Sequence, residues 1–329
     1  MAVDTVGVGI LGTGRIANAF ATDLLNAEGV ELCAVGSRAQ ASADEFALEF
    51  GCGTAYDSYE AVAADSDVEL VYVATPHSLH CTNSLMCLDA GKHVLCEKPF
   101  TINTDEAQLV VKRALDRGLF LMEAMWTRYV PAVIHLRELL AAGTLGNVQL
   151  MVSGGAYMPE RDLDAYLFRP ELGGGVLLDA GMYMVSMASM IFGCPSRIQA
   201  SCEFGPSGVD EHDVMVLGHP SGALANFYVS LRARKSPDVW LLGDRANLHL
   251  HAPIYCPRGM TLQPHDGPAQ ELDFDFPGNG YQFEAQEAAR CIRAGEMESP
   301  IMPLDETLSI MGTLDAIRAQ FGLRYPMEG

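Results

Sequence analysis

The chain has 329 residues, of which 42 are acidic and 21 are basic, so its formal net charge is −21. Hydrophobic residues make up 49% of the sequence, which is typical of a soluble globular protein and excludes disordered, collagen-like and coiled-coil chains. Lys and Arg form no basic stripe, and binding to phosphate polymers needs such clusters. We therefore expect neither nucleic acid nor a membrane surface as a partner.

The nine cysteines show no close CxxC pair and no zinc-finger spacing. We expect them to be reduced thiols. The N-terminus carries Asp4 and an interrupted glycine-rich run, unlike the basic start and continuous apolar core of a secretory signal. The longest membrane-like stretch, residues 181–192, is too short to span a bilayer. These features together predict a cytoplasmic protein.

Short apolar runs alternate with runs of helix length over the first 125 residues. The predicted strands are residues 6–11, 31–35, 70–74, 93–96 and 120–124. The predicted helices between them are residues 15–27, 41–50, 79–90 and 105–117. Repeated strand and helix predict a parallel sheet with both faces covered, so residues 1–125 are predicted to form an α/β Rossmann domain that binds a dinucleotide.

The pattern changes from about Met125. The predicted elements that follow are a helix at 131–142, strands at 148–153, 212–217, 223–231 and 247–251, and helices at 281–294 and 304–321. The loop 219–222 has the composition of a hairpin connection, and residues 247–251 alternate as they would on a sheet with one wet face. Residues 126–329 are therefore predicted to form an α+β domain with a large, mostly antiparallel open sheet.

A phosphate-binding turn is predicted at Gly12-Thr13-Gly14-Arg15-Ile16-Ala17, which fits G-x-G-x-x-[GA]. The motif follows the first strand and opens the first helix, which is the context that a dinucleotide-binding turn requires. Gly12 permits the tight turn, Gly14 lets the backbone approach a pyrophosphate, and free N–H groups at the helix start meet its charge. A glycine-rich turn without a ligand is the alternative.

The end of the second strand decides between the two nicotinamide cofactors. An acidic residue there would bind the ribose 2′-hydroxyl and repel a 2′-phosphate, but this chain has Ser37 and Arg38. A hydroxyl donor beside a planar guanidinium favours NADP. The alternative is that Arg38 is a solvent-facing loop residue, and use of NAD is compatible with either interpretation.

Two further clusters follow the fourth and fifth strands, at the edge where ligands bind in open α/β sheets. The first contains Thr75, Pro76, His77 and His80, and the second is Glu97-Lys98-Pro99. A lysine that leaves a buried strand at this edge needs a ligand or a carboxylate. An ordinary salt-bridged lysine is the alternative for Lys98, and Pro99 could follow a cis peptide bond.

A third cluster starts with three glycines, Gly173, Gly174 and Gly175, which allow close approach of a ligand or of another backbone. The following residues read as a helix that places Asp179 and Tyr183 on one face at i, i+4. Taken alone, this pair also fits a core tyrosine bonded to an aspartate at a helix start.

These motifs together resemble the Gfo/Idh/MocA oxidoreductase family. Further matching stretches are Glu123-Ala124-Met125-Trp126-Thr127-Arg128 and Gly278-Asn279-Gly280-Tyr281. The resemblance covers almost the whole chain. It is greatest for the branch of dimeric dihydrodiol dehydrogenases and NADP-dependent D-xylose dehydrogenases, because Tyr183 stands where many other members have histidine. The chain differs from the family at His77, where relatives often carry asparagine.

The resemblance implies an NADP-dependent dehydrogenase that transfers a hydride between nicotinamide and a cyclic sugar, a polyol or a trans-dihydrodiol, in either direction. Tyr183 would transfer the proton, and the positive charge of Lys98 would favour the phenolate, because a free tyrosine with a pKa of about 10 is a poor base at neutral pH. Asp179 would orient the substrate hydroxyl.

Other residues receive weaker assignments. The cofactor-binding residues expected on these grounds are Gly12, Thr13, Gly14, Arg15, Ile16, Ser37, Arg38, Thr75, Pro76, His77, His80, Glu97 and Lys98. Trp126 and Phe168 are expected to line the substrate pocket with aromatic walls, whereas Arg169 is either a substrate contact or a structural residue. His249 and His251 share one strand face, but no third ligand joins them, so no metal is predicted.

Two other functions are left open. One is an inositol or amino-sugar dehydrogenase of the same family. The other is a non-catalytic NADP(H)-binding sensor, which has no need of Lys98, Asp179 and Tyr183 together. The second domain's sheet has more apolar surface than its few helices cover, and family members commonly dimerise through it, so the resemblance implies a homodimer.

Overall fold

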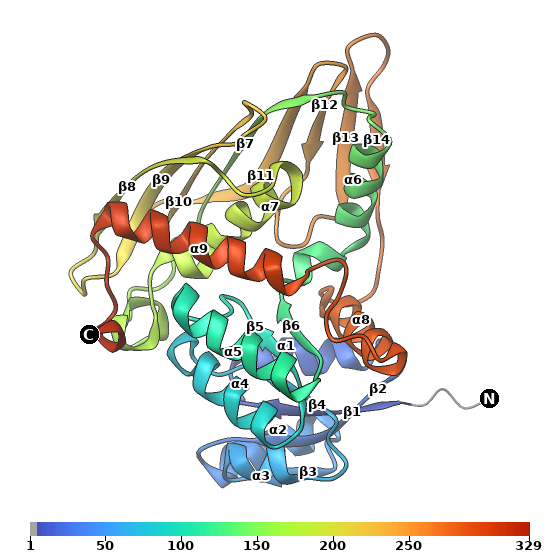
Figure 1. Cartoon of the computed structure of the whole chain (residues 1–329), viewed down its shortest axis with the longest axis vertical. Helices are drawn as coiled ribbons and strands as arrows, with labels where there is room; N and C mark the ends of the chain where they lie inside the picture. Colours follow the sequence, from blue (N-terminus) through green and yellow to red (C-terminus); the bar gives the residue numbers. More distant parts are fainter. Residues whose placement is uncertain (1–4) are drawn as a thin grey trace. The chain divides into compact units, whose positions relative to one another are not determined.

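The computed structural model describes residues 5–329, so Asp4 lies outside the described residues. The chain divides into two compact units (Figure 1). Unit 1 contains the chain up to Trp126 together with Pro277–Leu308, and unit 2 contains Thr127–Phe276 and Ser309–Gly329. The predicted boundary at 125/126 falls beside the first division. The predicted continuous second domain, 126–329, differs from the structure because residues 277–308 return to unit 1.

Unit 1 is built on a six-stranded sheet in the order β3-β2-β1-β4-β5-β6, whose strand pairs are parallel. Its strands are β1 (Val6–Leu11), β2 (Val30–Gly36), β3 (Thr54–Tyr56), β4 (Leu70–Val73), β5 (His93–Glu97) and β6 (Leu121–Ala124). Its helices are α1 (Arg15–Leu24), α2 (Gln40–Phe50), α3 (Tyr59–Ala64), α4 (His80–Asp89), α5 (Thr104–Arg117) and α8 (Tyr281–Ala294). The order reverses between β1 and β4, and such a switch point is where open α/β sheets bind ligands. The Rossmann domain is confirmed.

Asp23 explains why α8 belongs to unit 1. Its side chain is fully buried on α1 and accepts hydrogen bonds from the backbone N–H groups of Asn279, Gly280 and Tyr281 at 2.8–2.9 Å. Gly280 is the N-cap of α8, has a φ of 116° and has no side chain of its own to cap the helix. The carboxylate therefore satisfies N–H groups that the start of α8 leaves open and favours the positive end of the helix dipole.

Unit 2 contains an eight-stranded sheet in the order β14-β13-β12-β11-β7-β10-β9-β8. Its strands are β7 (Val148–Ala156), β8 (Arg197–Phe204), β9 (Asp210–Gly218), β10 (Leu224–Ser230), β11 (Lys235–Gly243), β12 (Ala246–Leu250), β13 (Gly259–Pro264) and β14 (Gln270–Asp273). The pairing is antiparallel except between β7 and β10, so the mostly antiparallel sheet is confirmed. Its helices are α6 (Pro131–Ala141) and α7 (Met182–Phe192), and α9 (Leu304–Phe321) begins in unit 1 and continues in unit 2.

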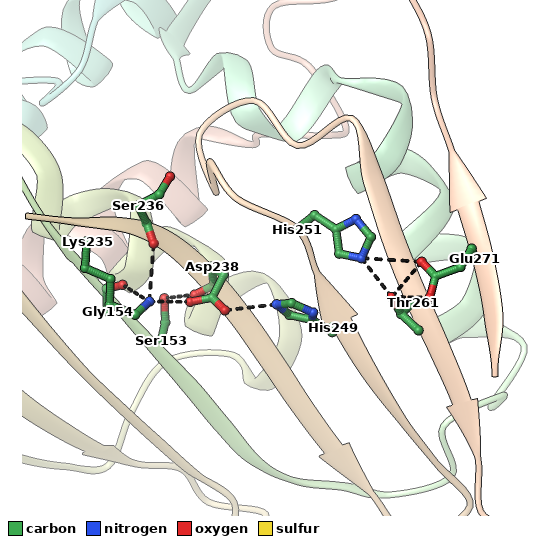
Figure 2. A network of polar contacts seen from close by, with 9 residues as sticks. All are labelled: Ser153, Gly154, Lys235, Ser236, Asp238, His249, His251, Thr261 and Glu271. Atoms are coloured by element: carbon green, nitrogen blue, oxygen red, sulfur yellow. Dashed lines mark hydrogen bonds and ion pairs between the residues drawn. The ribbon is translucent and has the colours of Figure 1, made fainter.

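The sheet of unit 2 has one covered and one open face. Figure 1 shows α6 and α7 on the same side of it. On β12, Leu248 and Leu250 are buried and His249 is half-buried, so the predicted alternation is confirmed. On the open face His249 hydrogen-bonds Asp238 at 2.9 Å. Figure 2 shows this pair between Lys235 and a second group of polar contacts, which joins His251, Thr261 and Glu271. Within residues 5–329 no group of three or more His, Cys, Asp or Glu side chains could hold a metal ion.

One helical run, Pro170–Phe192, is long and apolar enough to cross a membrane by length and composition alone. Of its most apolar window, 72% is buried inside the protein, as in the core helix of a globular domain. The nine cysteines are all free thiols.

Candidate cofactor and substrate sites

The β1–α1 turn has the open geometry that a phosphate needs. Gly12 has a φ of 102°, and a Cβ there would lie 2.8 Å from the carbonyl oxygen of Ala74. A Cβ at Gly14 would meet no described atom within 4 Å. Gly14 is also the N-cap of α1, and no side chain of the described residues caps the helix. The N–H groups at the start of α1 are therefore left open by the side chains of residues 5–329, as an anion site requires.

Asn18 fixes this turn from within α1. Its amide nitrogen donates to the carbonyl oxygens of Thr13 and Gly14 at 3.1 and 2.8 Å. The carbonyl groups of the turn are thereby held by the helix, and Ala17 is fully buried where α1 packs against the sheet. The turn thus has the geometry that the sequence predicted for Gly12–Ala17 and fits a dinucleotide phosphate.

The end of β2 presents a cation beside this turn. Arg38 is exposed and makes no ion pair with any residue from 5 to 329. Its guanidinium lies near Tyr59. Burial raises the pKa of Tyr59, and the positive charge of Arg38 partly opposes this shift. Ser37 is half-buried, and its N–H donates to the carbonyl of Tyr56 at 3.0 Å. The arrangement leaves a guanidinium at the edge where a ribose phosphate would bind.

The loops after β4 and β5 are joined by His80. Its ring is fully buried, and its two nitrogens lie 2.8 Å from the carbonyl oxygens of Pro99 and Thr75. Burial lowers the pKa of this imidazole; the hydrogen bonds to the two carbonyls oppose the shift, and the nearby Lys98 charge adds to it. The sequence predicted that His80 contacts the cofactor. In the structure both ring nitrogens face backbone carbonyls, so His80 positions the two loops, and its contact with the cofactor stays a prediction.

Glu97 and Lys98 lie at the carboxyl end of β5, on the sheet edge that carries these loops. Glu97 is buried; it accepts a hydrogen bond from the Tyr72 hydroxyl and another, at 3.0 Å, from the N–H of Lys98. Lys98 is half-buried and precedes a cis peptide bond to Pro99. Thr75 and His77 are buried beside Pro76 on the adjacent loop. The predicted cofactor residues of both loops therefore meet at one sheet edge.

Glu284 is an acid that the sequence did not single out. It lies in the first turn of α8, is fully buried, and neither of its oxygens has a hydrogen-bond partner among residues 5–329. Burial raises its pKa well above the usual range, and the charges of Glu97 and Asp23 add to the shift. The surroundings of Glu284 therefore favour its protonated form.

Asp179 is held in unit 2 by two tyrosines. The Tyr166 hydroxyl donates to Oδ1 of Asp179 at 2.7 Å, and the Tyr157 hydroxyl donates to Oδ2. Asp179 lies in a π-helical turn, Leu177–Gly181, that runs directly into α7. The predicted helix is present, but the wider turn replaces the regular i, i+4 spacing between Asp179 and Tyr183.

Tyr183 lies in the first turn of α7 and against a third tyrosine. Its side chain is 9% exposed, and its ring centroid lies 5.9 Å from that of Tyr255. Arg128 fixes the next turn of α7, because its guanidinium donates to the hydroxyl and to the carbonyl of Ser186 at 3.1 and 2.8 Å. Thr127 donates to the Tyr255 carbonyl at 2.9 Å. No local motif marks Tyr157, Tyr166 or Tyr255, and only the fold brings them together.

A buried acid supports the glycine loop beneath Asp179. Asp210 accepts the N–H of Leu177 at 2.7 Å, and a Cβ on Gly175 would lie 2.0 Å from its other oxygen. Gly174 is equally confined, because a Cβ there would lie 2.6 Å from the Tyr166 carbonyl oxygen. The Tyr325 hydroxyl donates to the Gly174 carbonyl at 2.7 Å. The glycines therefore serve close approach of other protein groups.

The three residues predicted to contact the substrate do not all lie in the same unit. Trp126 belongs to unit 1 and stacks on Tyr281 with ring centroids 4.2 Å apart. Phe168 lies in unit 2 and is 3% exposed. Arg169 donates to Glu171 at 2.7 Å, which fits the structural alternative.

Comparisons with known proteins agree with this geometry. Residues 6–125 match the model of the oxidoreductase family with an NAD-binding Rossmann fold, GFO_IDH_MocA, and residues 133–249 match the GFO/IDH/MocA C-terminal domain. Trans-1,2-dihydrobenzene-1,2-diol dehydrogenase from Bos taurus is 36% identical, with 97% of this chain and 98% of that protein covered. The chain belongs to the Gfo/Idh/MocA oxidoreductase family.

Other Gfo/Idh/MocA relatives show the same breadth of match. D-xylose 1-dehydrogenase (NADP(+)) from Hypocrea jecorina is 33% identical, covering 98% of this chain and 93% of that protein. Among solved structures, aldose–aldose oxidoreductase from Caulobacter crescentus, complexed with glycerol, has a TM-score of 0.88 at 24% identity, with 96% of this chain and 97% of that chain covered. The structural match concerns the fold alone. The predicted family and the oxidoreductase class are confirmed.

Proposed function

We propose that this protein is an NADP-dependent dehydrogenase that transfers a hydride between nicotinamide and a cyclic sugar, a polyol or a trans-dihydrodiol. The observation that carries the proposal is the uncapped start of α1 at Gly14, which suits a dinucleotide phosphate, in a chain related over its whole length to dihydrodiol and D-xylose dehydrogenases. The bound cofactor would accept or supply the hydride.

NADP rather than NAD is supported by the end of β2. Arg38 has no acidic partner among the described residues and is exposed beside the phosphate turn. A guanidinium binds a phosphate in a planar, bidentate manner, and a 2′-phosphate is what distinguishes NADP at this position. Ser37 would supply a hydroxyl donor to the same group.

The proton transfer is proposed for Tyr183, supported by Lys98. Oxidation of an alcohol releases a proton from the reacting oxygen, and Tyr183 would take it up as the general base. The positive charge of Lys98 would stabilise the phenolate. Asp179 would accept a hydrogen bond from a substrate hydroxyl, because its two tyrosine donors fix the direction of the carboxylate.

The test is the appearance of reduced cofactor, measured by its absorbance, across a panel of pyranoses, inositols, amino sugars and trans-dihydrodiols with NADP⁺ and NAD⁺. NADP⁺-dependent turnover of a pyranose or a dihydrodiol is the expected result. Preferential turnover of inositols or amino sugars would move the substrate class within the family. Tight binding of NADPH with turnover of none of these compounds would favour the sensor.

The open sheet face supports a homodimer. On this face Trp240 is half-buried, Leu224 is 38% exposed and Val214 is 50% exposed, although no helix of the described chain covers them. A second copy would bury this apolar surface. Sedimentation of the purified protein should give the mass of a dimer, and Trp240→Arg should give a monomer.

The free cysteines support a cytoplasmic location.

A further inference from the structure

Unit 2 contains a cavity of about 560 Å³ whose charged residues have no role in the proposed hydride and proton transfer. It is formed by the segment after β7, the end of β10 and the loop that leads to β11. Its lining residues are Met158, Pro159, Glu160, Arg161, Phe168, Leu231, Arg232 and Arg234. Three guanidinium groups thus border one cavity in a chain whose net charge is −21.

Two of these arginines are held by a buried carboxylate. Glu211 has a fully buried side chain; Arg161 donates to its Oε1 at 2.7 Å, and Arg232 donates to its Oε2 at 3.0 Å. Arg232 also donates to the carbonyl of Phe204 at 2.8 Å. A guanidinium has five N–H donors, so Arg161 and Arg232 keep donors beyond those that Glu211 uses. Glu211 therefore fixes both groups at the cavity wall.

Arg234 adds a charge that Glu211 does not balance. Its side chain is exposed, and the structure gives it no ion pair with any residue between 5 and 329. With Glu160 and Glu211 counted against the three arginines, the cavity keeps an excess of one positive charge. Like charges gathered in this way repel one another unless an anion joins them.

The remaining wall is apolar. Phe168 and Leu231 are buried, and the Arg161 guanidinium carbon lies 5.7 Å from the centre of the Phe168 ring. A ligand with an apolar or aromatic body and an oxyanion at one end would match both parts of the wall, because guanidinium groups bind carboxylate and phosphate in a planar fork.

The cavity shares its main segment with the contacts of Asp179. Residues 157–168 supply Tyr157 and Tyr166 to that carboxylate and also supply Arg161 and Phe168 to the cavity. We propose that this cavity is a binding site for the carboxylate or phosphate group of a small organic ligand. Where the proposed dehydrogenase function holds, this group is an anionic extension of the substrate.

Binding of small probes tests the site without turnover. Calorimetry of the full-length protein with saturating NADP⁺ would compare phenyl phosphate and benzoate with benzyl alcohol, which has the same ring but no charge. We expect one or both anions to bind at least about tenfold more tightly than benzyl alcohol. The probe that binds shows whether phosphate or carboxylate is the group.

Arg234→Gln should weaken anion binding about tenfold, because one charge-assisted contact is lost. The control is Arg197→Gln, which removes an exposed arginine on β8 outside the cavity and should leave binding unchanged. Equal affinity for the anions and benzyl alcohol, or equal losses in the two variants, would overturn the site. Turnover of neutral sugars with no anion binding would reject the anion site and leave the proposed dehydrogenase function standing. Anion binding without turnover of any substrate would support the anion site and reject the proposed dehydrogenase function.

Discussion

The hydroxyl of Tyr166 donates a 2.7 Å hydrogen bond to Oδ1 of Asp179, across a glycine loop whose backbone leaves no room for a side chain at Gly174. The loop that carries the tyrosine and the helical turn that carries the carboxylate are therefore fixed to each other before a substrate arrives. Such preorganisation lowers the cost of orienting a substrate hydroxyl.

Removing the Asp179 charge should impair catalysis more than removing its donor. Asp179→Asn should lower kcat/KM about a hundredfold, equal to about 2.7 kcal/mol, because a hydrogen bond to a charged group is lost. Tyr166→Phe should lower it only about threefold to tenfold, mainly through KM. Steady-state kinetics on the substrate found in the panel measure both. Tyr228→Phe, on the sheet of unit 2, is the matched control, and equal kinetics in all three variants would contradict this role for Asp179.

Arg38→Gln should change cofactor preference. Loss of a bidentate contact to the 2′-phosphate should raise the KM for NADP⁺ about tenfold to a hundredfold, whereas the KM for NAD⁺ should stay within about twofold. Arg197→Gln should change neither constant. A variant that keeps the wild-type ratio of the two KM values would show that Arg38 is an ordinary surface residue.

Asp23→Ala should destabilise the protein. The backbone N–H groups of Asn279 and Tyr281 would lose their carboxylate acceptor, and that of Gly280 would keep only the Gln282 side chain, at a cost of about 3 kcal/mol in the free energy of unfolding. Urea denaturation measures the change. The control Asp116→Ala removes an exposed carboxylate paired with Lys112 and should cost less than about 1 kcal/mol. Equal losses in both variants would contradict the capping of α8.

The buried pair Asp210 and Asp213 should make stability depend on pH. Burial raises the pKa of Asp213 to about 10, and the charge of Asp210 adds to the shift. The unfolded chain releases this proton near pH 4, whereas the folded protein keeps it up to about pH 10. Because the folded state then binds more protons, stability from this group is full below pH 4 and falls as the pH rises towards 10.

Asp213→Asn removes this titrating group, and with it the group's contribution to the pH dependence of the free energy of unfolding. Between pH 5 and pH 8 the free energy of unfolding of the wild type should fall relative to the variant, by up to about 1.4 kcal/mol per pH unit. Denaturation curves of both proteins across this range give the difference. Parallel pH profiles would show that Asp213 is ionised in the folded protein.

Local patterns predicted most elements of unit 1, but they did not predict four strands of the unit 2 sheet, β8, β11, β13 and β14. Strand β1 and helices α8 and α9 begin and end at the predicted residues. The three-residue strand β3 and the short helix α3 were missed because so few residues give no readable period.

The links between distant parts of the chain were not predictable in this way. Asp23 binds residues more than 250 positions later, and the sequence did not show that His80 is buried between the carbonyl groups of Thr75 and Pro99. The phosphate turn was found because its function depends on neighbouring residues. The two tyrosines that bind Asp179 were not, because only tertiary structure brings their segment, residues 157–168, to this carboxylate.

The most direct test of the proposed mechanism is the kcat of Tyr183→Phe for NADP⁺ reduction on a confirmed substrate. The account predicts a loss of about a hundredfold to ten-thousandfold, with NADP⁺ affinity unchanged, because the phenylalanine cannot exchange the proton. Lys98→Met should show a large loss of the same kind. Full turnover by both variants would contradict the proposal that these two residues carry the proton transfer.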